Sequence, residues 1–164
     1  MSGKSTLGLK LAAATGSPFV DLDLRIEASQ GMSISGIFAQ KGVEAFRLLE
    51  REALGAVLTI PGVVVATGGG IVESDLKQLL DGHRVLYLFC ERDEAISRLM
   101  AHPRPLQSGP VEFSSLSDFQ AAQTAQYDAL WSRRGALYEA LGGTMILTSG
   151  VSVEATLEAC LNSL

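Results

Sequence analysis

Cysteine is scarce in this chain of 164 residues, which contains only Cys90 and Cys160. The two lie far apart in the sequence and match no metal-ligand spacing, so we interpret both as buried thiols. His83 and His102 are isolated from other metal-binding residue types, and we expect them at the surface or in loops. The sequence therefore predicts no metal centre built on cysteine or histidine.

Long apolar runs are also missing, as is an excess of positive charge. No run approaches the roughly 20 residues of a membrane span, and Gly8 and Lys10 interrupt any apolar segment of a signal peptide. The formal net charge is −5, whereas affinity for nucleic acid comes from clustered Lys and Arg. We therefore expect a cytoplasmic protein with neither a membrane nor a nucleic-acid partner.

Half of a phosphate-binding motif is absent, while the other half opens the chain. Gly3, Lys4, Ser5 and Thr6 match the second half of the pattern G-x-x-x-x-G-K-[ST]. In such a loop, backbone N–H groups surround phosphate oxygens, the Lys ammonium reaches the outer phosphates and the hydroxyl binds Mg²⁺. A polar N-terminal tail is the alternative interpretation. The apolar helical pattern that follows, ended by Gly16, favours the phosphate site.

A short apolar segment, residues 18–23, ends in Asp21 and Asp23. Parallel strands of α/β proteins carry functional residues at their carboxyl ends, and residues two apart in a strand share a face. We therefore expect both carboxylates in one crevice. The alternative is a helix N-terminus, where the helix dipole favours acids.

Residues 42–58 show an amphipathic helical pattern with Phe46 on the apolar face and Arg47 beside it. Arg47 is a candidate ligand-binding residue. Its alternative role is an exposed ion pair with Glu44, Glu50 or another acid, which stabilises a protein little.

Three successive glycines follow the apolar strand expected at residues 63–66: Gly68, Gly69 and Gly70. Glycines at such a place let a ligand approach the main chain closely. A flexible linker is the alternative, but linkers do not usually follow a fully apolar strand. We interpret the triplet as a ligand-contacting turn.

Residues 103–117 are rich in Ser, Gly and Pro and show no periodicity. We predict a mobile lid loop here. Arg104 lies between Pro103 and Pro105 in a stiff, extended stretch. Its alternative role is a solvated loop charge.

Strand-length apolar segments alternate with helical patterns along the chain. We expect strands at residues 18–23, 63–66, 84–90 and 144–147. We expect later helices at residues 42–58, 73–81, 93–100, 118–141 and 153–164. This alternation predicts one α/β domain, residues 1–164, with a parallel sheet covered by helices on both faces. The chain therefore begins one strand late.

Six features occur in the order found in shikimate kinases: GKST, DLD followed by Ile26-Glu27, a glycine before Phe46-Arg47, TGGG, Arg104-Pro105-Leu106, and Arg134 four residues before Tyr138. One such feature is weak evidence, but the ordered set is specific and spans nearly the whole chain. The chain thus resembles the shikimate kinase family. These P-loop kinases transfer the ATP γ-phosphate to the 3-hydroxyl of shikimate in aromatic amino-acid biosynthesis.

The resemblance implies a nucleotide site with Mg²⁺. Lys4 would be the catalytic lysine of the phosphate loop, Ser5 would bind Mg²⁺, and Asp21 would support the ion through water. Arg104 would move in with the lid and neutralise charge on the transferring phosphate. The implied ATP-binding residues are Gly3, Lys4, Ser5, Thr6, Arg98 and Arg104, of which Arg98 is the looser match because its spacing to Arg104 varies in the family.

The resemblance also implies a shikimate site. Asp23 would be the catalytic carboxylate that binds the shikimate hydroxyls and orients the attacking one. Arg47 and Arg134 would clamp the shikimate carboxylate, for which the bidentate guanidinium group is suited. The substrate would also contact the backbone of Gly68, Gly69 and Gly70. The partners are then ATP and shikimate, and we expect a monomer.

Two departures from the family accompany these matches. The family often has an acid where Val43 stands, and its sheet order 2-3-1-4-5 places the absent strand at the centre. Buried unpaired backbone groups cost roughly 1–3 kcal/mol each, against a total stability of about 5–15 kcal/mol. We therefore hypothesise that Met1 is a truncated or wrongly assigned start and that about 10–15 residues precede it, unless the remaining strands close the gap.

Two other functions fit parts of the pattern. One is a non-catalytic, shikimate-kinase-like sensor domain of a larger regulator. The filled catalytic positions favour the enzyme, because a sensor need not keep both the Mg²⁺ and acceptor sites. The other is a different small-molecule P-loop kinase, such as a gluconate kinase, against which Arg47, Arg134 and the TGGG segment argue by analogy.

Overall fold

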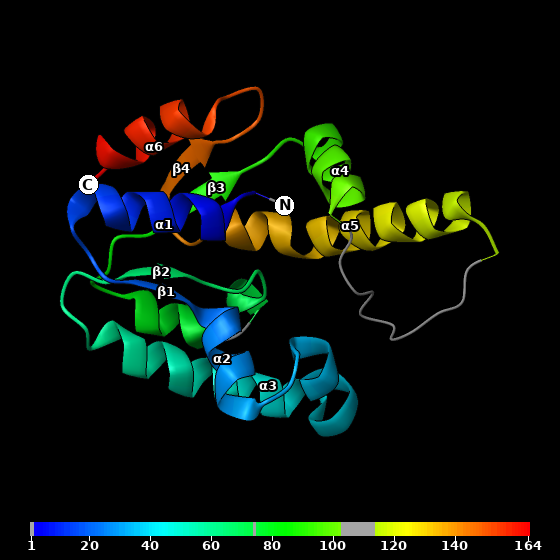
Figure 1. The fold of residues 1–164 in the computed structure, drawn as a ribbon, viewed down its shortest axis with the longest axis horizontal. Coiled ribbons are helices and arrows are strands. Elements are labelled where there is room, and N and C mark those ends of the chain that lie inside the picture. Colours follow the sequence, from blue (N-terminus) through cyan, green and yellow to red (C-terminus); the bar gives the residue numbers. More distant parts are fainter. Residues whose placement is uncertain (1, 74, 103–113) are drawn as a thin grey trace.

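The computed structural model describes residues 2–73, 75–102 and 114–164. Helices and short strands alternate along the chain (Figure 1). The strands are β1 (Phe19–Asp21), β2 (Val64–Ala66), β3 (Leu86–Phe89) and β4 (Thr144–Leu147). The α-helices are α1 (Lys4–Thr15), α2 (Leu22–Gln30), α3 (Ile34–Leu58), α4 (Arg92–Ala101), α5 (Leu116–Glu139) and α6 (Val153–Leu161). Two 3₁₀ helices follow the glycine triplet, η1 (Ile71–Glu73) and η2 (Asp75–Leu80).

The strands form two separate parallel pairs. β1 pairs with β2, setting Phe19 opposite Val64, and β3 pairs with β4, setting Leu86 opposite Thr144. Within the described residues, no strand joins the two pairs into one sheet. The predicted α/β class with parallel strands is confirmed. The order 2-3-1-4-5 stays a prediction, because the strand that would connect the pairs is not among these four.

Each strand pair has its own apolar core. The larger core packs α2 and α3 against β1, β2 and the 3₁₀ helices, and its buried residues are Leu22, Ile26, Ile37, Phe46, Leu54, Val57, Ile71, Val72 and Leu76. The smaller core joins α1, β4 and α6 through Leu7, Leu11, Ile146 and Cys160. Val64 of β2 packs against the smaller core together with Leu86 and Leu88 of β3. In Figure 1, α1 runs between the two pairs.

Local sequence signals set the ends of the first elements. Gly16 follows α1 in the left-handed conformation, with φ of 65°, which a residue without Cβ adopts readily. Asp21 caps α2 by accepting a hydrogen bond from the Leu24 N–H. The strand expected at residues 18–23 therefore ends at Asp21, and Asp23 lies in the first turn of α2. The expectation that both carboxylates project from one strand face was wrong.

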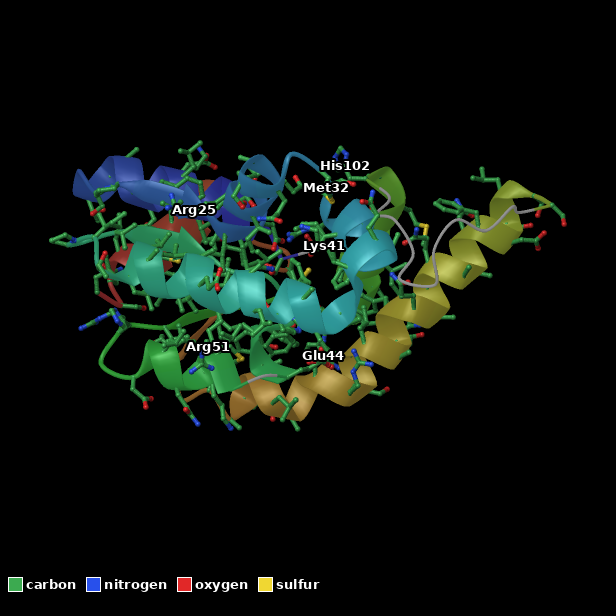
Figure 2. The ribbon with its side chains drawn as sticks, turned by 90° about the horizontal axis from the view of Figure 1, so that it is seen from below. Arg25, Met32, Lys41, Glu44, Arg51 and His102 are labelled. Atoms are coloured by element: carbon green, nitrogen blue, oxygen red, sulfur yellow. The ribbon has the colours of Figure 1, made fainter. Side chains whose placement is uncertain are left out.

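Helix α3 is bent at Gly42, which has φ of 80° and ψ of 175°. Figure 2 labels Lys41, directly before this glycine, and Glu44, two residues after it, where the ribbon of α3 changes direction. The predicted helix at residues 42–58 is thus the second arm of α3. The first arm begins at Ile34, behind a Ser33 cap that accepts a hydrogen bond from the Gly36 N–H.

Other predicted boundaries differ in detail. The described part of the helix predicted at residues 73–81 is 3₁₀ rather than α-helical, in η1 up to Glu73 and in η2 over Asp75–Leu80. Most of the predicted lid, residues 103–117, lies outside the described residues, and its last two residues begin α5. Both cysteines are buried and unpaired, and both histidines are exposed, as predicted. In the described part of the chain, no helix has the length and apolarity to cross a membrane.

Candidate active site

The predicted phosphate-binding residues lie together at the start of α1. Gly3 precedes the helix in the left-handed conformation, with φ of 79°, and its carbonyl accepts the Leu7 N–H at 2.9 Å. Lys4, Ser5 and Thr6 form the first turn. A first helical turn presents N–H groups that the helix does not bond, and its dipole attracts anions. The geometry of this turn therefore suits a phosphate group.

Ser5 and Asp21 meet at the carboxyl end of β1. The Ser5 hydroxyl donates to Asp21 Oδ2 at 2.5 Å, and Asp21 Oδ1 accepts the Leu24 N–H at 3.3 Å. A hydroxyl beside a carboxylate offers the hard oxygen donors that Mg²⁺ prefers, with phosphates and water completing its octahedron. The pair fits the predicted ion. No group of three or more His, Cys, Asp or Glu residues with the arrangement of a metal site occurs among the described residues.

The glycine triplet is surrounded by predicted substrate-binding side chains. A Cβ at Gly68 would lie 3.1 Å from Asp23 Oδ1 and 2.9 Å from Glu50 Oε1. A Cβ at Gly70 would lie under 3.0 Å from the guanidinium atoms of Arg47. Only glycine leaves room for these charged groups. The predicted ligand-contacting turn thus brings Asp23 and Arg47 together, from α2 and α3.

Helix α5 brings Arg134 to the same turn. A Cβ at Gly69 would lie 3.7 Å from Arg134 Nη1, and the Tyr138 hydroxyl donates a short hydrogen bond to the Gly69 carbonyl. Tyr138 stacks on Tyr87 of β3, with ring centroids 5.3 Å apart. These contacts fix α5 against both β3 and the glycine triplet. The spacing of four between Arg134 and Tyr138 puts both on that face.

Both predicted clamp arginines are engaged by carboxylates. Arg47 Nη1 donates to Glu50 Oε2 at 2.5 Å, so the ion pair considered from sequence forms alongside the proximity to the glycines. Arg134 Nε donates to Glu73 Oε2 at 2.7 Å. Arg47 Nη2 lies 3.8 Å from the same Glu73 oxygen. Arg133 Nε donates a short hydrogen bond to Glu73 Oε1.

The two carboxyl groups have opposite pKa shifts. Burial raises the pKa of Glu50, although the hydrogen bond and charge of Arg47 oppose this; its Oε1 is a buried acceptor with no hydrogen-bond partner. Burial also acts to raise the pKa of Glu73, but the hydrogen bonds from Arg134 and Arg133 outweigh it and leave that pKa lowered. Glu73 is therefore firmly ionised.

Sequence reasoning missed Glu73 and Tyr138 as parts of the site. Glu73 lies three residues beyond the triplet. Its sequence neighbours do not indicate a role in the site, because its partners come from the distant helices α3 and α5. Tyr138 was noted for its spacing only. Glu50 was named from the sequence as one of the acids that could pair with Arg47, from which it lies one turn away.

The remaining predicted nucleotide residues are placed only in part. Arg98 of α4 donates to the Thr148 carbonyl at 2.7 Å and to Glu94 Oε1 at 2.5 Å, which holds it at the end of β4. Its contact with ATP stays a prediction. Arg104 lies outside the described residues.

Comparison with known proteins identifies the family of this chain. The family model for shikimate kinase matches residues 1–164. The shikimate kinase of Streptomyces coelicolor is 34% identical over 163 residues, covering 98% of this chain and 88% of that relative. The enzymes of Mycobacterium ulcerans and Mycobacterium marinum are 43% identical over 111 residues, covering 66% of this chain. The chain spans 60% of the length of these two relatives.

Solved structures show the same fold. Shikimate kinase from Bacteroides thetaiotaomicron superimposes with a TM-score of 0.83 at 23% identity, over 98% of this chain and 91% of that one. Shikimate kinase from Acinetobacter baumannii, solved in complex with shikimate, gives a TM-score of 0.82 at 26% identity, over 98% of this chain and 86% of that one. The chain therefore belongs to the shikimate kinase family.

Proposed function

We propose that this protein transfers the γ-phosphate of ATP to the 3-hydroxyl of shikimate. The observation that carries the proposal is the convergence of Asp23, Arg47 and Arg134 on the glycine triplet, each from a different helix. A ring acid with several hydroxyls needs cations at one end and a hydrogen-bond acceptor at the other, and this arrangement offers both.

In this proposal the phosphates of ATP bind at the start of α1. Phosphoryl transfer depends on positioning and on positive charge rather than on covalent chemistry. Lys4 and the backbone N–H groups of the first turn of α1 hold the transferring phosphate. Gly3, in its left-handed conformation, sets the direction in which the chain enters α1. Ser5 and Asp21 would hold Mg²⁺, and the ion would supply positive charge to neutralise the phosphates. Thr6, Arg98 and Arg104 complete the proposed ATP-binding set.

Shikimate, which accepts the phosphate, binds at the glycine triplet. Arg47 and Arg134 bind the shikimate carboxylate through their N–H groups, and the backbone of Gly68, Gly69 and Gly70 lies against the ring. Asp23 accepts a hydrogen bond from the attacking hydroxyl and orients it toward the phosphate. These roles require the side chains of α2, α3 and α5 around the glycine triplet to hold the substrate in one orientation.

We also propose that the active form has a further strand between β2 and β3. Val64 of β2 shares a core with Leu86 and Leu88 of β3 although the two strands are not hydrogen-bonded to each other. A strand in this place would satisfy both edges, and its carboxyl end would lead into the phosphate loop before Gly3. It would occupy the central position of the predicted order 2-3-1-4-5.

The test is ATP-dependent phosphorylation of shikimate, measured for the 164-residue chain and for a version extended by a strand that completes G-x-x-x-x-G-K-S. Activity of the extended protein, abolished by Lys4→Ala, is the expected result. If the extended protein binds shikimate but transfers no phosphate, the function is ligand sensing rather than catalysis. Phosphorylation of gluconate in place of shikimate would contradict the proposed substrate.

A further inference from the structure

Glu73 lies where an incoming carboxylate would have to bind. Its Oε2 is 2.5 Å from Arg134 Nη2, 2.7 Å from Arg134 Nε and 3.8 Å from Arg47 Nη2. One carboxylate oxygen thus lies between the two arginines assigned to the substrate. We propose that Glu73 is an internal competitor of the substrate carboxylate and sets the affinity of the site for it; the inference rests on the proposed shikimate site.

The hydrogen-bonding edges of the arginines explain the competition. A guanidinium group offers paired N–H groups to a carboxylate, and the pair with matched geometry gives the strongest bond. Glu73 occupies the Nε–Nη2 edge of Arg134. Glu50 occupies Nη1 of Arg47. A second carboxylate can reach these arginines fully only after Glu73 withdraws.

The charges around the glycine triplet also indicate that Glu73 competes with an incoming carboxylate. Three arginines face three carboxylates around the glycine triplet, so an anion would enter a set whose charges cancel: Arg47, Arg133 and Arg134 against Asp23, Glu50 and Glu73. The side chains of Arg134, Glu73 and Arg47 are only 11%, 17% and 21% exposed. Solvent therefore screens these charges weakly, and withdrawal of Glu73 removes a negative charge from between Arg47 and Arg134.

Arg133 gives the withdrawn carboxylate a partner. Its Nε already donates to Glu73 Oε1, and its side chain is 59% exposed. Glu73 can turn outward about its side-chain bonds while it keeps this ion pair. The adjacent arginines then have different tasks, since Arg134 faces the substrate and Arg133 holds Glu73 when the substrate is bound.

The test is calorimetric binding of shikimate, without nucleotide, to the wild-type chain and to Glu73→Gln. The amide keeps the shape of the side chain but removes its charge, and we expect roughly tenfold tighter binding, the size of one partly buried ion pair. The methyl ester of shikimate, which carries no charge, should bind the two proteins equally. This difference between acid and ester separates competition from a structural effect.

The matched control is Asp128→Asn, which removes one carboxylate charge from a two-bond pair with Arg92 on the exposed side of α5. It should leave shikimate affinity unchanged. Arg133→Gln is a second, surface variant. Because Arg133 pairs with Glu73 both before and after the proposed withdrawal, this variant should change shikimate affinity less than Glu73→Gln does.

Each outcome has one meaning. Equal or weaker shikimate binding by Glu73→Gln, in a wild-type protein that binds shikimate, would overturn the inference and leave the proposed function intact. Tighter binding of acid and ester alike would also overturn it, because the charge would then be irrelevant. If neither protein binds shikimate, with or without the added strand of the extended version, the proposed substrate and this role of Glu73 are both overturned.

Discussion

At the scale of single residues, the site depends on a close approach of charged groups to glycine. The guanidinium of Arg47 occupies the space that a side chain at position 70 would need. The residue types and their order along the chain identify Arg47 and the glycines as partners. Their contact is a property of the fold, because α3 must cross the turn after β2.

The first prediction concerns Gly70→Ala. The added methyl group would push Arg47 off the glycine triplet, and we expect the KM for shikimate to rise about 10- to 100-fold, the effect of misplacing a positioning group. The KM for ATP should stay within about twofold, because the nucleotide residues lie at the start of α1. Steady-state kinetics with each substrate varied separately would check this. An equal rise in both KM values would contradict a local effect on Arg47, and a loss of Vmax with both KM values unchanged would indicate unfolding.

A second prediction follows from the buried Glu50. Burial, opposed by Arg47, raises its pKa above 4.5 in the folded state. Below about pH 4.5 the Glu50 carboxyl is protonated in both the folded and the unfolded state, so its burial does not lower the free energy of unfolding. As pH rises through the folded-state pKa, the native protein must ionise a buried carboxyl, so stability is lost. The free energy of unfolding of the wild type should therefore fall relative to Glu50→Gln as the pH rises above about 4.5, the ordinary pKa of the unfolded group.

Urea unfolding at several pH values would measure this difference. It should change by about 1.4 kcal/mol for each unit by which the pKa is raised. Glu154→Gln, at an exposed pair with Lys10, should show no such trend. A wild type that gains stability over Glu50→Gln as pH rises would mean that the Arg47 pair outweighs burial.

At the scale of elements, the bend of α3 separates two functions of one helix. Gly42 has φ of 80° and ψ of 175°, a region open almost only to glycine. The arm before the bend covers α2, and the arm after it carries Arg47 and Glu50. The sequence predicted the second arm from its apolar spacing, but not its continuation from Ile34, since a glycine inside a helix reads as a boundary.

The third prediction compares two glycines of this helix. Gly42→Ala forces a strained backbone and should lower the free energy of unfolding by about 1–3 kcal/mol. Gly55→Ala adds a methyl group at a helical position with nothing within 4 Å and should raise it by about 0.5–1 kcal/mol. Thermal and chemical unfolding would give both values. Similar effects at the two positions would contradict the role of the bend.

Strands and helices were predicted more reliably in kind than in extent. β4 has its predicted bounds, because turns on both sides of Thr144–Leu147 limit the length of the strand. β1 is shorter than expected because Asp21 caps a helix instead of extending a strand. The segment after the glycine triplet forms 3₁₀ turns, which share the apolar spacing of a short α-helix. The roles of the site residues remain predictions that the assays above address.

At the scale of the whole molecule, two strand pairs share one helix, α1, which contacts both β2 and α6. The alternation of apolar segments was sufficient to predict the class. The pairing of strands was not open to local reasoning, because parallel neighbours are distant in sequence.

The fourth prediction tests the proposed central strand by its effect on stability. Relative to the 164-residue chain, the extended protein should gain several kcal/mol, since each buried backbone hydrogen bond restored avoids roughly 1–3 kcal/mol. Amides of β2 and β3 should become slower to exchange with deuterium, while those of α3 change little. Unchanged exchange at both strands would show that the added segment lies elsewhere.

The open sides of β2 and β3 also affect how molecules of this protein meet one another. Apolar strands with unpaired N–H and C=O groups serve as templates for strands of neighbouring chains. With a net charge of only −5, long-range repulsion offers limited protection. The practical consequence is aggregation that increases with protein concentration. A short complementary peptide that pairs with these strands should reduce it.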